Sequence, residues 1–518
     1  MRPDHEIAII GAGIGGLGTA IALREAGFDD LVILERASDI GGTWRDNTYP
    51  GVGVDIPAQA YQFSYELKPD WSRIFAKGAE VKAYVDQVAA HHDLWPLIRL
   101  DHEVLARTWD EDAGIWRLAV PGGELTARYV ISAIGAFVDP KPTAIEGVET
   151  FEGPVLRSAS WDHDVDLRDR RVAIVGTGAS AVQIVPELAD EVARLDVYQR
   201  TPIWVAPKPD LPTPRALEAL FRRVPRVQQL VRRATTRGTE VILIDLVTDH
   251  DRYGWMERGM RRALRDLWYP LQVRDRELRR RLTPDYDFGC KRPAVSNRYL
   301  RTFTRDHVEL VTDPIARITP RGVAVTRPDG TVQEREVDVL VLATGFRLAT
   351  DPENYRRTPV RGRDGFDLAT FYAQERATSY ESVSIPGLPN HFMIFGPYGW
   401  TGGTWHQLVE TASAHVVRVL QEARRRDRDV VAVRPEAAQR WTRFAVERMG
   451  RSLWQQGTCA PARSYYFDHH GDTPFLRPTT AAEAARAAAS FPLEDYVYEH
   501  SPAAARSAAT PMAPSAAG

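Results

Sequence analysis

At 518 residues the chain is long enough for several domains, each with a sizeable core. Its formal net charge of -3 and its pI near 6.5 provide no basic surplus for a nucleic-acid partner, and we expect none. Its two cysteines, Cys290 and Cys459, are too few for a disulfide framework or a CxxC metal site, so we expect no metal and a reducing cytosol.

The first expected strand begins at residue 7, which leaves no room for a signal peptide before it. No apolar run is long enough to cross a bilayer. We therefore expect a cytoplasmic protein without a membrane partner, and the oligomeric state stays open.

The chain opens with a pattern that predicts a dinucleotide-binding unit. An apolar run at 7–10 predicts a strand, Gly11-x-Gly13-x-x-Gly16 follows it, a helical pattern continues, and a second apolar run at 31–34 ends at Glu35. The glycines allow a tight turn and bring backbone N–H groups to a pyrophosphate at a helix N-terminus, and Glu35 is placed to bind a ribose hydroxyl. A lone glycine motif also occurs in surface turns, but the complete unit favours an adenine dinucleotide.

Residues 41–55, GGTWRDNTYPGVGVD, are expected to form a loop because glycine and proline are dense there. The stretch resembles the [A/G]GxWxxxx[F/Y]P[G/M]xxxD motif of type I Baeyer–Villiger monooxygenases, which are class B flavoprotein monooxygenases, and every fixed position matches. The resemblance implies that three residues lie along FAD: Thr43, Trp44 and Asp46. It also places Asp55 beside the isoalloxazine ring and Tyr61 against the flavin. Without the resemblance, a packed loop with an aromatic anchor is the alternative.

Residues 151–162 resemble a second family fingerprint, FxGxxxHxxxW[P/D], with Arg157 where histidine is expected. The ending Trp161-Asp162 favours the Baeyer–Villiger branch over the flavin-containing monooxygenase branch. The family's histidine lies on the hinge between two nucleotide domains, and arginine cannot titrate near neutrality as histidine does. Arg157 therefore bears on domain motion and coupling, or it is a harmless linker variation.

A second dinucleotide unit follows. An apolar run at 171–175 leads into Gly176-x-Gly178-x-x-Ala181, a helix to about residue 190, and a strand at 195–198. NAD sites place an acid after this second strand, whereas an arginine accommodates the 2′-phosphate of NADP. The strand here is followed by Arg200 and Thr201, which favours NADPH, although Arg200 also fits a solvated cation at a strand end. The expected cofactor-binding residues of this unit are Gly176, Gly178, Ser180, Ala181, Arg200 and Thr201.

Three further segments match the family. In residues 288–293, FGCKRP, the resemblance implies that Lys291 clamps the NADP 2′-phosphate and that Arg292 enters the active site; by sequence alone the pair would be surface charge. Trp454 resembles a tryptophan near the nicotinamide ribose, where an indole N–H can donate. The loop with Trp400 is more aromatic than in relatives, which indicates either a bulky pocket or simple loop packing.

These patterns predict an α/β fold with two dinucleotide-binding, Rossmann-like domains and a helical insertion. We expect residues 1–140 and 342–500 to form the FAD-binding domain and residues 141–208 and 288–341 to form the NADPH-binding domain. Residues 209–287 have helical spacing without strands and form the expected insertion. The Ala, Ser and Pro-rich tail, 501–518, is expected to be disordered.

The resemblance extends over roughly residues 5 to 480. It implies an FAD-containing, NADPH-dependent Baeyer–Villiger monooxygenase that takes a small-molecule ketone and O₂ and forms an ester or lactone through a C4a-peroxyflavin. Arg292 and Asp55 are the implied catalytic pair, with Arg292 stabilising developing negative charge and Asp55 holding it in place. Two alternatives stay open: an S- or N-oxygenating monooxygenase of the same fold, and a non-catalytic flavin-binding protein.

Overall fold

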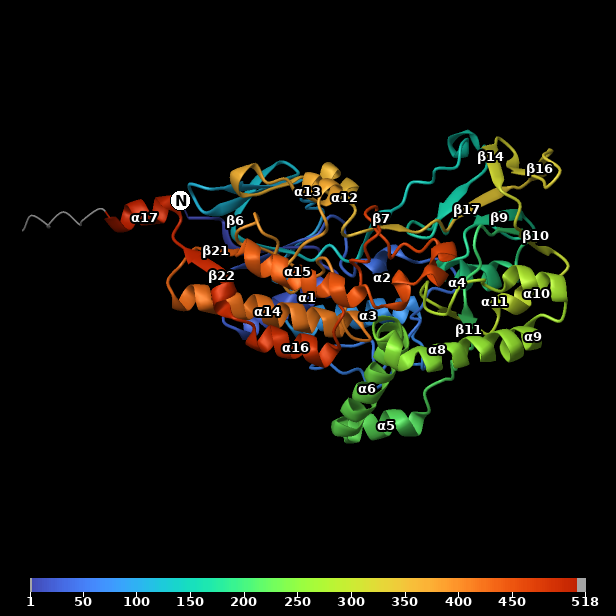
Figure 1. Ribbon diagram of the computed structural model, residues 1–518, viewed down its shortest axis with the longest axis horizontal. Coiled ribbons are helices and arrows are strands. Elements are labelled where there is room, and N and C mark those ends of the chain that lie inside the picture. Colours follow the sequence, from blue (N-terminus) through green and yellow to red (C-terminus); the bar gives the residue numbers. More distant parts are fainter. Residues whose placement is uncertain (1, 510–518) are drawn as a thin grey trace, which may run out of the picture.

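The computed structural model describes residues 2–509. Its two largest β-sheets lie one toward each end of the molecule, with helices around and between them (Figure 1). Within the described residues, one sheet has eight strands and the other has five. The predicted fold class, two Rossmann-like domains with helical segments, is confirmed.

The larger sheet is built around β1, His5–Ile10, which pairs in parallel with β2, Leu31–Leu34, and β6, Gly123–Ser132. The strand order is β19-β4-β5-β6-β1-β2-β3, with β20 also beside β6. The central strands are apolar on both faces because helices cover both, as parallel strands require. The remaining strands are β3 (Ile98–Arg99), β4 (Ala106–Asp110), β5 (Ile115–Val120), β19 (Val360–Arg361) and β20 (His391–Met393).

Helix α1, Ile14–Glu25, packs between β1 and α14, Trp405–Arg425. Close packing of α1 explains its small residues: a Cβ at Gly18 would lie 2.7 Å from the Phe63 ring. The other helical segments of this half are α3 (Gly78–His91), η1 (Trp95–Leu97), α12 (Pro352–Arg357), η5 (Arg363–Gly365), α13 (Leu368–Gln374), α15 (Pro435–Met449), η6 (Leu453–Gln455), η7 (Gly457–Ala462), α16 (Ala481–Ser490) and η8 (Leu493–Asp495), and strands β21 (Val430–Val433) and β22 (Tyr496–Glu499) pair with each other.

The smaller sheet is fully parallel, in the order β13-β10-β9-β17-β8. Its members are β8 (Val155–Arg157), β9 (Arg171–Val175), β10 (Arg194–Tyr198), β13 (Val308–Val311) and β17 (Val339–Leu342). Helix α4, Ala179–Leu188, follows β9 as α1 follows β1. Around this sheet lie η2 (Val148–Thr150), α11 (Tyr299–Thr302), the pair β11 (Val205–Ala206) and β12 (Ala294–Val295), and the antiparallel sheet β14 (Ile315–Thr319), β15 (Gly322–Thr326) and β16 (Val332–Glu336).

The chain crosses between the two sheets along a narrow ribbon. Strand β7, Phe137–Pro140, carries it out of the first sheet, and β18, Phe346–Leu348, brings it back antiparallel to β7. The stiff, proline-containing exit and the return segment therefore lie side by side.

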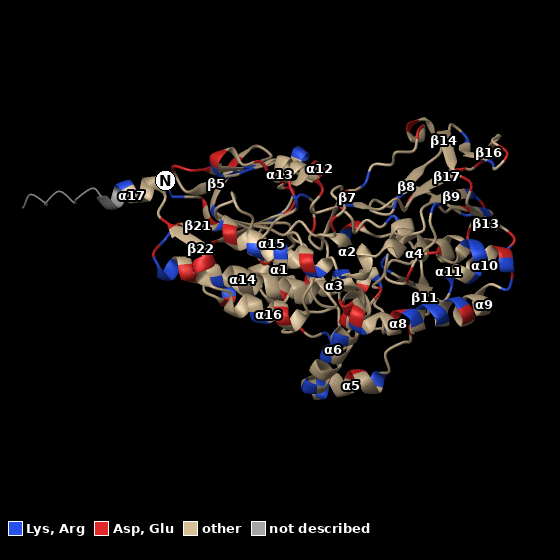
Figure 2. Cartoon of the chain, in the orientation of Figure 1, with Lys and Arg blue, Asp and Glu red and all other residues tan. Residues whose placement is uncertain are grey.

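The segment predicted to be helical consists of helices from residue 215 to residue 282 and protrudes below the two sheets in Figure 1. Its elements are α5 (Arg215–Arg223), α6 (Pro225–Glu240), η3 (Val241–Asp245), α7 (Leu246–Thr248), α8 (His250–Ala263), η4 (Leu264–Trp268), α9 (Tyr269–Gln272) and α10 (Arg276–Leu282). Basic and acidic residues are interspersed along α8 and α10 (Figure 2). Nearby carboxylates pair with some of the many arginines of this segment, for example Glu277 with Arg280.

Two local predictions were wrong. Part of the expected loop forms a one-turn helix, α2, Thr43–Asp46, because the backbone of Gly42 adopts a φ of +53° and starts the turn. The first part of the expected disordered tail forms helix α17, Pro502–Ala509, since alanine has the highest helix propensity and the Ser501 hydroxyl caps the Ala504 N–H at 3.3 Å. Residues 510–518 lie outside the described residues.

Among residues 2–509 we find no helix both long and apolar enough to cross a bilayer.

Candidate active site

Steric clashes exclude side chains from two positions of the first glycine turn. Gly11 has a φ of +102°, and a Cβ there would lie 2.8 Å from the Ala133 carbonyl oxygen. A Cβ at Gly16 would lie 1.9 Å from the Gly11 carbonyl oxygen, and a Cβ at Gly13 would approach Gly42 to 3.7 Å. The turn therefore presents bare backbone at the N-terminus of α1, which is the environment that a pyrophosphate needs.

Glu35 ties this turn to helix α2. Its carboxylate, only 4% exposed, accepts hydrogen bonds from the Ala12 N–H at 2.8 Å and from Arg45 Nη1 at 2.8 Å. Arg45 also donates through Nε to Asp46 at 2.7 Å, so it holds two of the predicted cofactor residues together. Sequence analysis missed Arg45, which occupies a variable position of the motif. The ribose contact of Glu35 stays a prediction.

Trp44 and Tyr61 form one aromatic unit beside α2. The indole N–H of Trp44 donates to the Tyr61 hydroxyl at 3.0 Å, and Tyr61 packs edge-on against His406 with ring centroids 4.7 Å apart. Burial raises the pKa of Tyr61, so its phenol stays protonated at neutral pH. Thr43 lies in the same turn. The structure thus brings the predicted flavin-facing residues of this segment together.

Asp55 and Arg292 meet across the two glycine units, although they are 237 residues apart in the chain. Arg292 donates through Nε and Nη2 to the two carboxylate oxygens of Asp55 at 2.7 and 2.8 Å, a bidentate geometry. Burial opposes ionisation of both groups, but the attraction between their charges is the larger effect. This attraction holds the pKa of Asp55 below its usual range and raises the pKa of Arg292. The pair is therefore charged at all working pH values and only partly exposed.

The second glycine turn is built like the first. Gly176 has a φ of +118°, and a Cβ there would lie 2.4 Å from the Ala343 carbonyl oxygen. Gly178 faces open space, and Ala181 is fully buried in helix α4. Ser180 interacts with the Tyr49 phenol of the first unit. The turn can accommodate a second pyrophosphate.

A cluster of unpaired positive charge surrounds Lys291. Burial and, to a smaller extent, the nearby charges of Arg200 and Arg463 together lower the pKa of Lys291 to about 8. Arg200 is exposed, and the backbone of the adjoining Thr201 accepts a hydrogen bond from the Thr177 hydroxyl at 2.9 Å. Such a cluster suits a phosphate group, which would relieve the repulsion. Sequence analysis missed Arg463, because it lies 172 residues from Lys291 in the numbering and belongs to no motif.

The segment after α15 contacts the residues that precede Lys291. The indole N–H of Trp454 donates to the Gly289 carbonyl at 2.8 Å, and the position of Trp454 near the nicotinamide ribose stays a prediction. Cys290 and Cys459 are joined in a disulfide. A cysteine count cannot reveal one bridge between residues 169 apart, so the inference from cysteine usage to a reducing compartment loses its premise.

Arg292 also borders a group of aromatic side chains. Its guanidinium lies 5.9 Å from the Trp400 ring centroid, and Trp400 stacks on Phe475 at 5.4 Å. Burial raises the pKa of Tyr465 and Tyr466, and the Arg292 charge offsets part of this effect. Tyr465 nevertheless exposes 41% of its surface, so this aromatic group is partly open to solvent.

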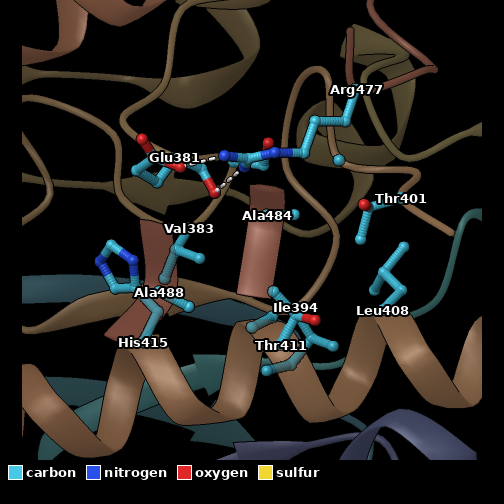
Figure 3. Close-up of a pocket in the computed structure, with 13 residues that line it drawn as sticks. Glu381, Val383, Ile394, Thr401, Leu408, Thr411, His415, Arg477, Ala484 and Ala488 are labelled. Atoms are coloured by element: carbon cyan, nitrogen blue, oxygen red, sulfur yellow. Dashed lines mark hydrogen bonds and ion pairs between the residues drawn. The ribbon is translucent and has the colours of Figure 1, made fainter. Parts of the chain in front are cut away.

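A separate small cavity lies next to the Trp400 loop (Figure 3). Thr401, His415 and the ion pair between Glu381 and Arg477 line it, and its volume is about 20 Å³. This space holds about one water molecule and is too small for an organic substrate. This cavity is therefore not the substrate site.

Comparisons with known proteins agree with this geometry. A family model described as pyridine nucleotide-disulphide oxidoreductase matches residues 8–220. A Baeyer-Villiger monooxygenase from Streptomyces coelicolor is 36% identical over 493 residues, which cover 95% of this chain and 92% of the relative. Another, from Pseudomonas aeruginosa, is 37% identical over 463 residues, covering 89% and 85%.

The chain belongs to the Baeyer–Villiger monooxygenase family.

A crystal structure of OTEMO in complex with FAD and NADP superposes on this family member with a TM-score of 0.81 at 25% identity, covering 94% of this chain and 98% of the other. The overall architecture is therefore shared over nearly the whole of both chains.

The pKa of Lys291 generates a test. We expect the affinity for NADP⁺ to fall as the pH rises above about 8, since the lysine then loses the proton that attracts the dianionic 2′-phosphate. Bound phosphate raises the pKa of Lys291 above its value in the free protein. Between these two pKa values, each added pH unit should weaken NADP⁺ binding by up to about tenfold. The dissociation constant of NADP⁺, titrated from about pH 7 to about pH 9.5, measures this linkage.

NAD⁺ lacks the 2′-phosphate and serves as the ligand control, and Lys291→Met serves as the matched variant. The dissociation constant of NAD⁺ from the unaltered chain, and that of NADP⁺ from the Lys291→Met variant, should stay constant over the same pH range. A flat profile for NADP⁺ with the unaltered chain would contradict the role assigned to Lys291.

Proposed function

We propose that this chain oxidises a small-molecule ketone to an ester or lactone, with NADPH and O₂ as co-substrates and FAD as the bound cofactor. The observation that carries the proposal is the bidentate Asp55–Arg292 ion pair, whose guanidinium lies beside the stacked rings of Trp400 and Phe475. Family membership and the FAD and NADP bound in a relative of the same fold support it.

FAD fits the first glycine unit. The backbone around Gly11 and Gly16 leaves no room for a side chain at the N-terminus of α1, where the pyrophosphate would lie, and Gly13 keeps the same turn free of a side chain. Glu35 is expected to hold the adenosine ribose, and the α2 segment with Tyr61 is expected to face the flavin. We accordingly assign residues 1–140 and 342–500 to FAD binding. When bound, FAD supplies the oxygen-transfer chemistry, with NADPH as its reductant.

NADPH fits the second glycine unit. Gly176 and Gly178 leave the backbone open for the pyrophosphate, and the cationic cluster of Arg200, Lys291 and Arg463 suits the 2′-phosphate. Thr201 follows Arg200 at the end of β10 and is expected to contribute to the same contact. We assign residues 141–208 and 288–341 to NADPH binding, and residues 209–287 to the helical insertion.

Arg292 performs the central electrostatic step. Attack on a ketone carbonyl moves negative charge onto the carbonyl oxygen, and a guanidinium that is charged at every working pH stabilises that charge. Asp55 occupies Nε and Nη2 of Arg292, which fixes the orientation of the guanidinium and leaves Nη1 to donate to the substrate oxygen. The aromatic side chains Trp400, Phe475 and Tyr465 exclude water from the substrate.

Replacement of Arg292 tests this assignment. We expect Arg292→Ala to lower the rate of ester formation by about 10²- to 10³-fold, the usual cost of removing a charge-stabilising donor. Reduction of bound FAD by NADPH should continue, because it needs no charge on the ketone oxygen. Rapid mixing measures flavin reduction, and mass analysis detects a product one oxygen heavier than its ketone.

Arg280→Ala is the matched control, since Arg280 is exposed and, within residues 2–509, its one ion pair is with Glu277 on helix α10. Ester formation that survives in Arg292→Ala would contradict the assignment. A panel that contains sulfides as well as ketones separates the reaction types, because sulfoxide as the sole product would indicate an S-oxygenating enzyme.

Cofactor choice gives a further test. We expect Arg200→Ala and Arg463→Ala each to raise the KM for NADPH by about tenfold or more, since each removes one charge from the 2′-phosphate cluster. The KM for NADH should stay nearly unchanged. An equal effect on both nucleotides would remove the case for 2′-phosphate recognition.

A further inference from the structure

The Cys290–Cys459 disulfide joins two pieces of the active site. Cys290 immediately precedes Lys291 and Arg292, and Cys459 belongs to η7, in the segment that follows α15. Both cysteines are almost completely buried, at 0% and 1% exposure. The bond therefore fastens the backbone that carries the central arginine to a segment 169 residues further along the chain.

The same segment, residues 453–466, approaches the site at several points. Trp454 donates its indole N–H to the Gly289 carbonyl at 2.8 Å and stacks on Tyr466 at 3.9 Å. Tyr466 lies within the electrostatic reach of Arg292, and Arg463 lies within that of Lys291. The position of this segment thus sets the surroundings of both the central arginine and the phosphate cluster.

The segment has little regular structure to hold it in place. Its elements are the 3₁₀ turns η6 and η7, which have poorer hydrogen-bond geometry than an α-helix and rarely persist alone. A covalent link restricts the alternatives open to such a segment far more than one hydrogen bond does. The disulfide is accordingly the strongest connection between residues 453–466 and the Arg292 backbone.

We propose that Cys290 and Cys459 form a redox-sensitive clamp that positions residues 453–466 over the active site. Reduction by a dithiol cleaves the S–S bond, gives two thiols, and converts the dithiol into its own disulfide. Hydrogen peroxide reverses the change: the two thiols give up two protons and two electrons, the S–S bond forms, and the peroxide becomes two waters. The oxidised clamp completes the site and the reduced clamp releases the segment. The effect on catalysis rests on the proposed function, whereas the bond and its effect on nucleotide binding do not.

A thiol count tests the bond itself. The full-length FAD-loaded protein is treated with hydrogen peroxide and then unfolded in the presence of iodoacetamide, which alkylates free thiols. Mass analysis should show no alkylated cysteine. The same protein after dithiothreitol should show both cysteines alkylated. Two alkylated cysteines in the peroxide-treated sample would overturn the proposal.

Because both sulfurs are buried, the rate at which dithiothreitol reduces the disulfide provides a second test. Dithiothreitol reaches the bond only when residues 453–466 lift away, so NADP⁺, held by Lys291 and Arg463, should slow reduction by about tenfold. Equal reduction rates with and without saturating NADP⁺ would show that the clamp and the nucleotide site are independent, and would overturn the proposal.

A variant cycle separates a clamp from two packed side chains. We expect Cys290→Ser, Cys459→Ser and the double variant to weaken NADP⁺ binding by the same factor, about tenfold, and to release more hydrogen peroxide per NADPH consumed. Reduced wild-type protein should match them, and dithiothreitol should leave the double variant unchanged. Effects that add in the double variant, or wild-type values in all three, would overturn the clamp.

The proposed function and the clamp can be contradicted independently. If no ketone yields a product, the proposed function fails, while the thiol count and the NADP⁺ protection still decide the clamp. If the products form but the variants and the reduced protein bind NADP⁺ as the oxidised protein does, the clamp fails and the proposed function stands.

Discussion

The bidentate contact between Asp55 and Arg292 is the interaction on which the site depends. One partner follows the first glycine unit and the other follows the helical segment, so the pair forms only when both halves of the molecule are correctly placed. A guanidinium buried beside a catalytic space would be costly without a carboxylate, because desolvation penalises an isolated charge. Asp55 offsets that cost and also sets the direction in which the free N–H groups of Arg292 point.

Contacts around the same loop hold the two halves together. The Tyr49 hydroxyl donates to the Gln183 side chain at 2.9 Å, and the amide of Gln183 donates to the Gly53 carbonyl at 2.9 Å. A Cβ at Gly51 would lie 2.6 Å from the Gln183 carbonyl oxygen, so only glycine permits this close approach to helix α4. The motif that was identified as a flavin-binding loop therefore also serves as the joint between the two glycine units.

The sequence predicted what is encoded locally and missed what depends on folding. The glycine turns, the apolar strands and the Asp55 and Arg292 positions belong to short motifs with fixed spacing, and the structure brings the last two together. Arg463 and the Cys290–Cys459 bond belong to no motif, and only the fold brings them beside Lys291 and Arg292. The hydrogen bond from the Trp454 indole N–H to the Gly289 carbonyl is likewise a tertiary contact that no local pattern encodes.

The site uses positive charge in two different ways. Arg292 is paired within the protein, so its charge is present before any ligand arrives and changes little on binding. Lys291 has cations as its charged neighbours, and its low pKa shows that the protein holds it in an unfavourable state. An anionic ligand relieves that repulsion, whereas it gains less from a cation already neutralised by a carboxylate. The paired arginine is suited to transient charge that develops during reaction, and the unpaired cluster is suited to a permanent anion. Residues 453–466 contribute Arg463 to the Lys291 cluster and Tyr466 to the surroundings of Arg292. The disulfide joins these residues to Cys290, which directly precedes Lys291 and Arg292. This attachment therefore links nucleotide binding to the surroundings of the reacting carbonyl.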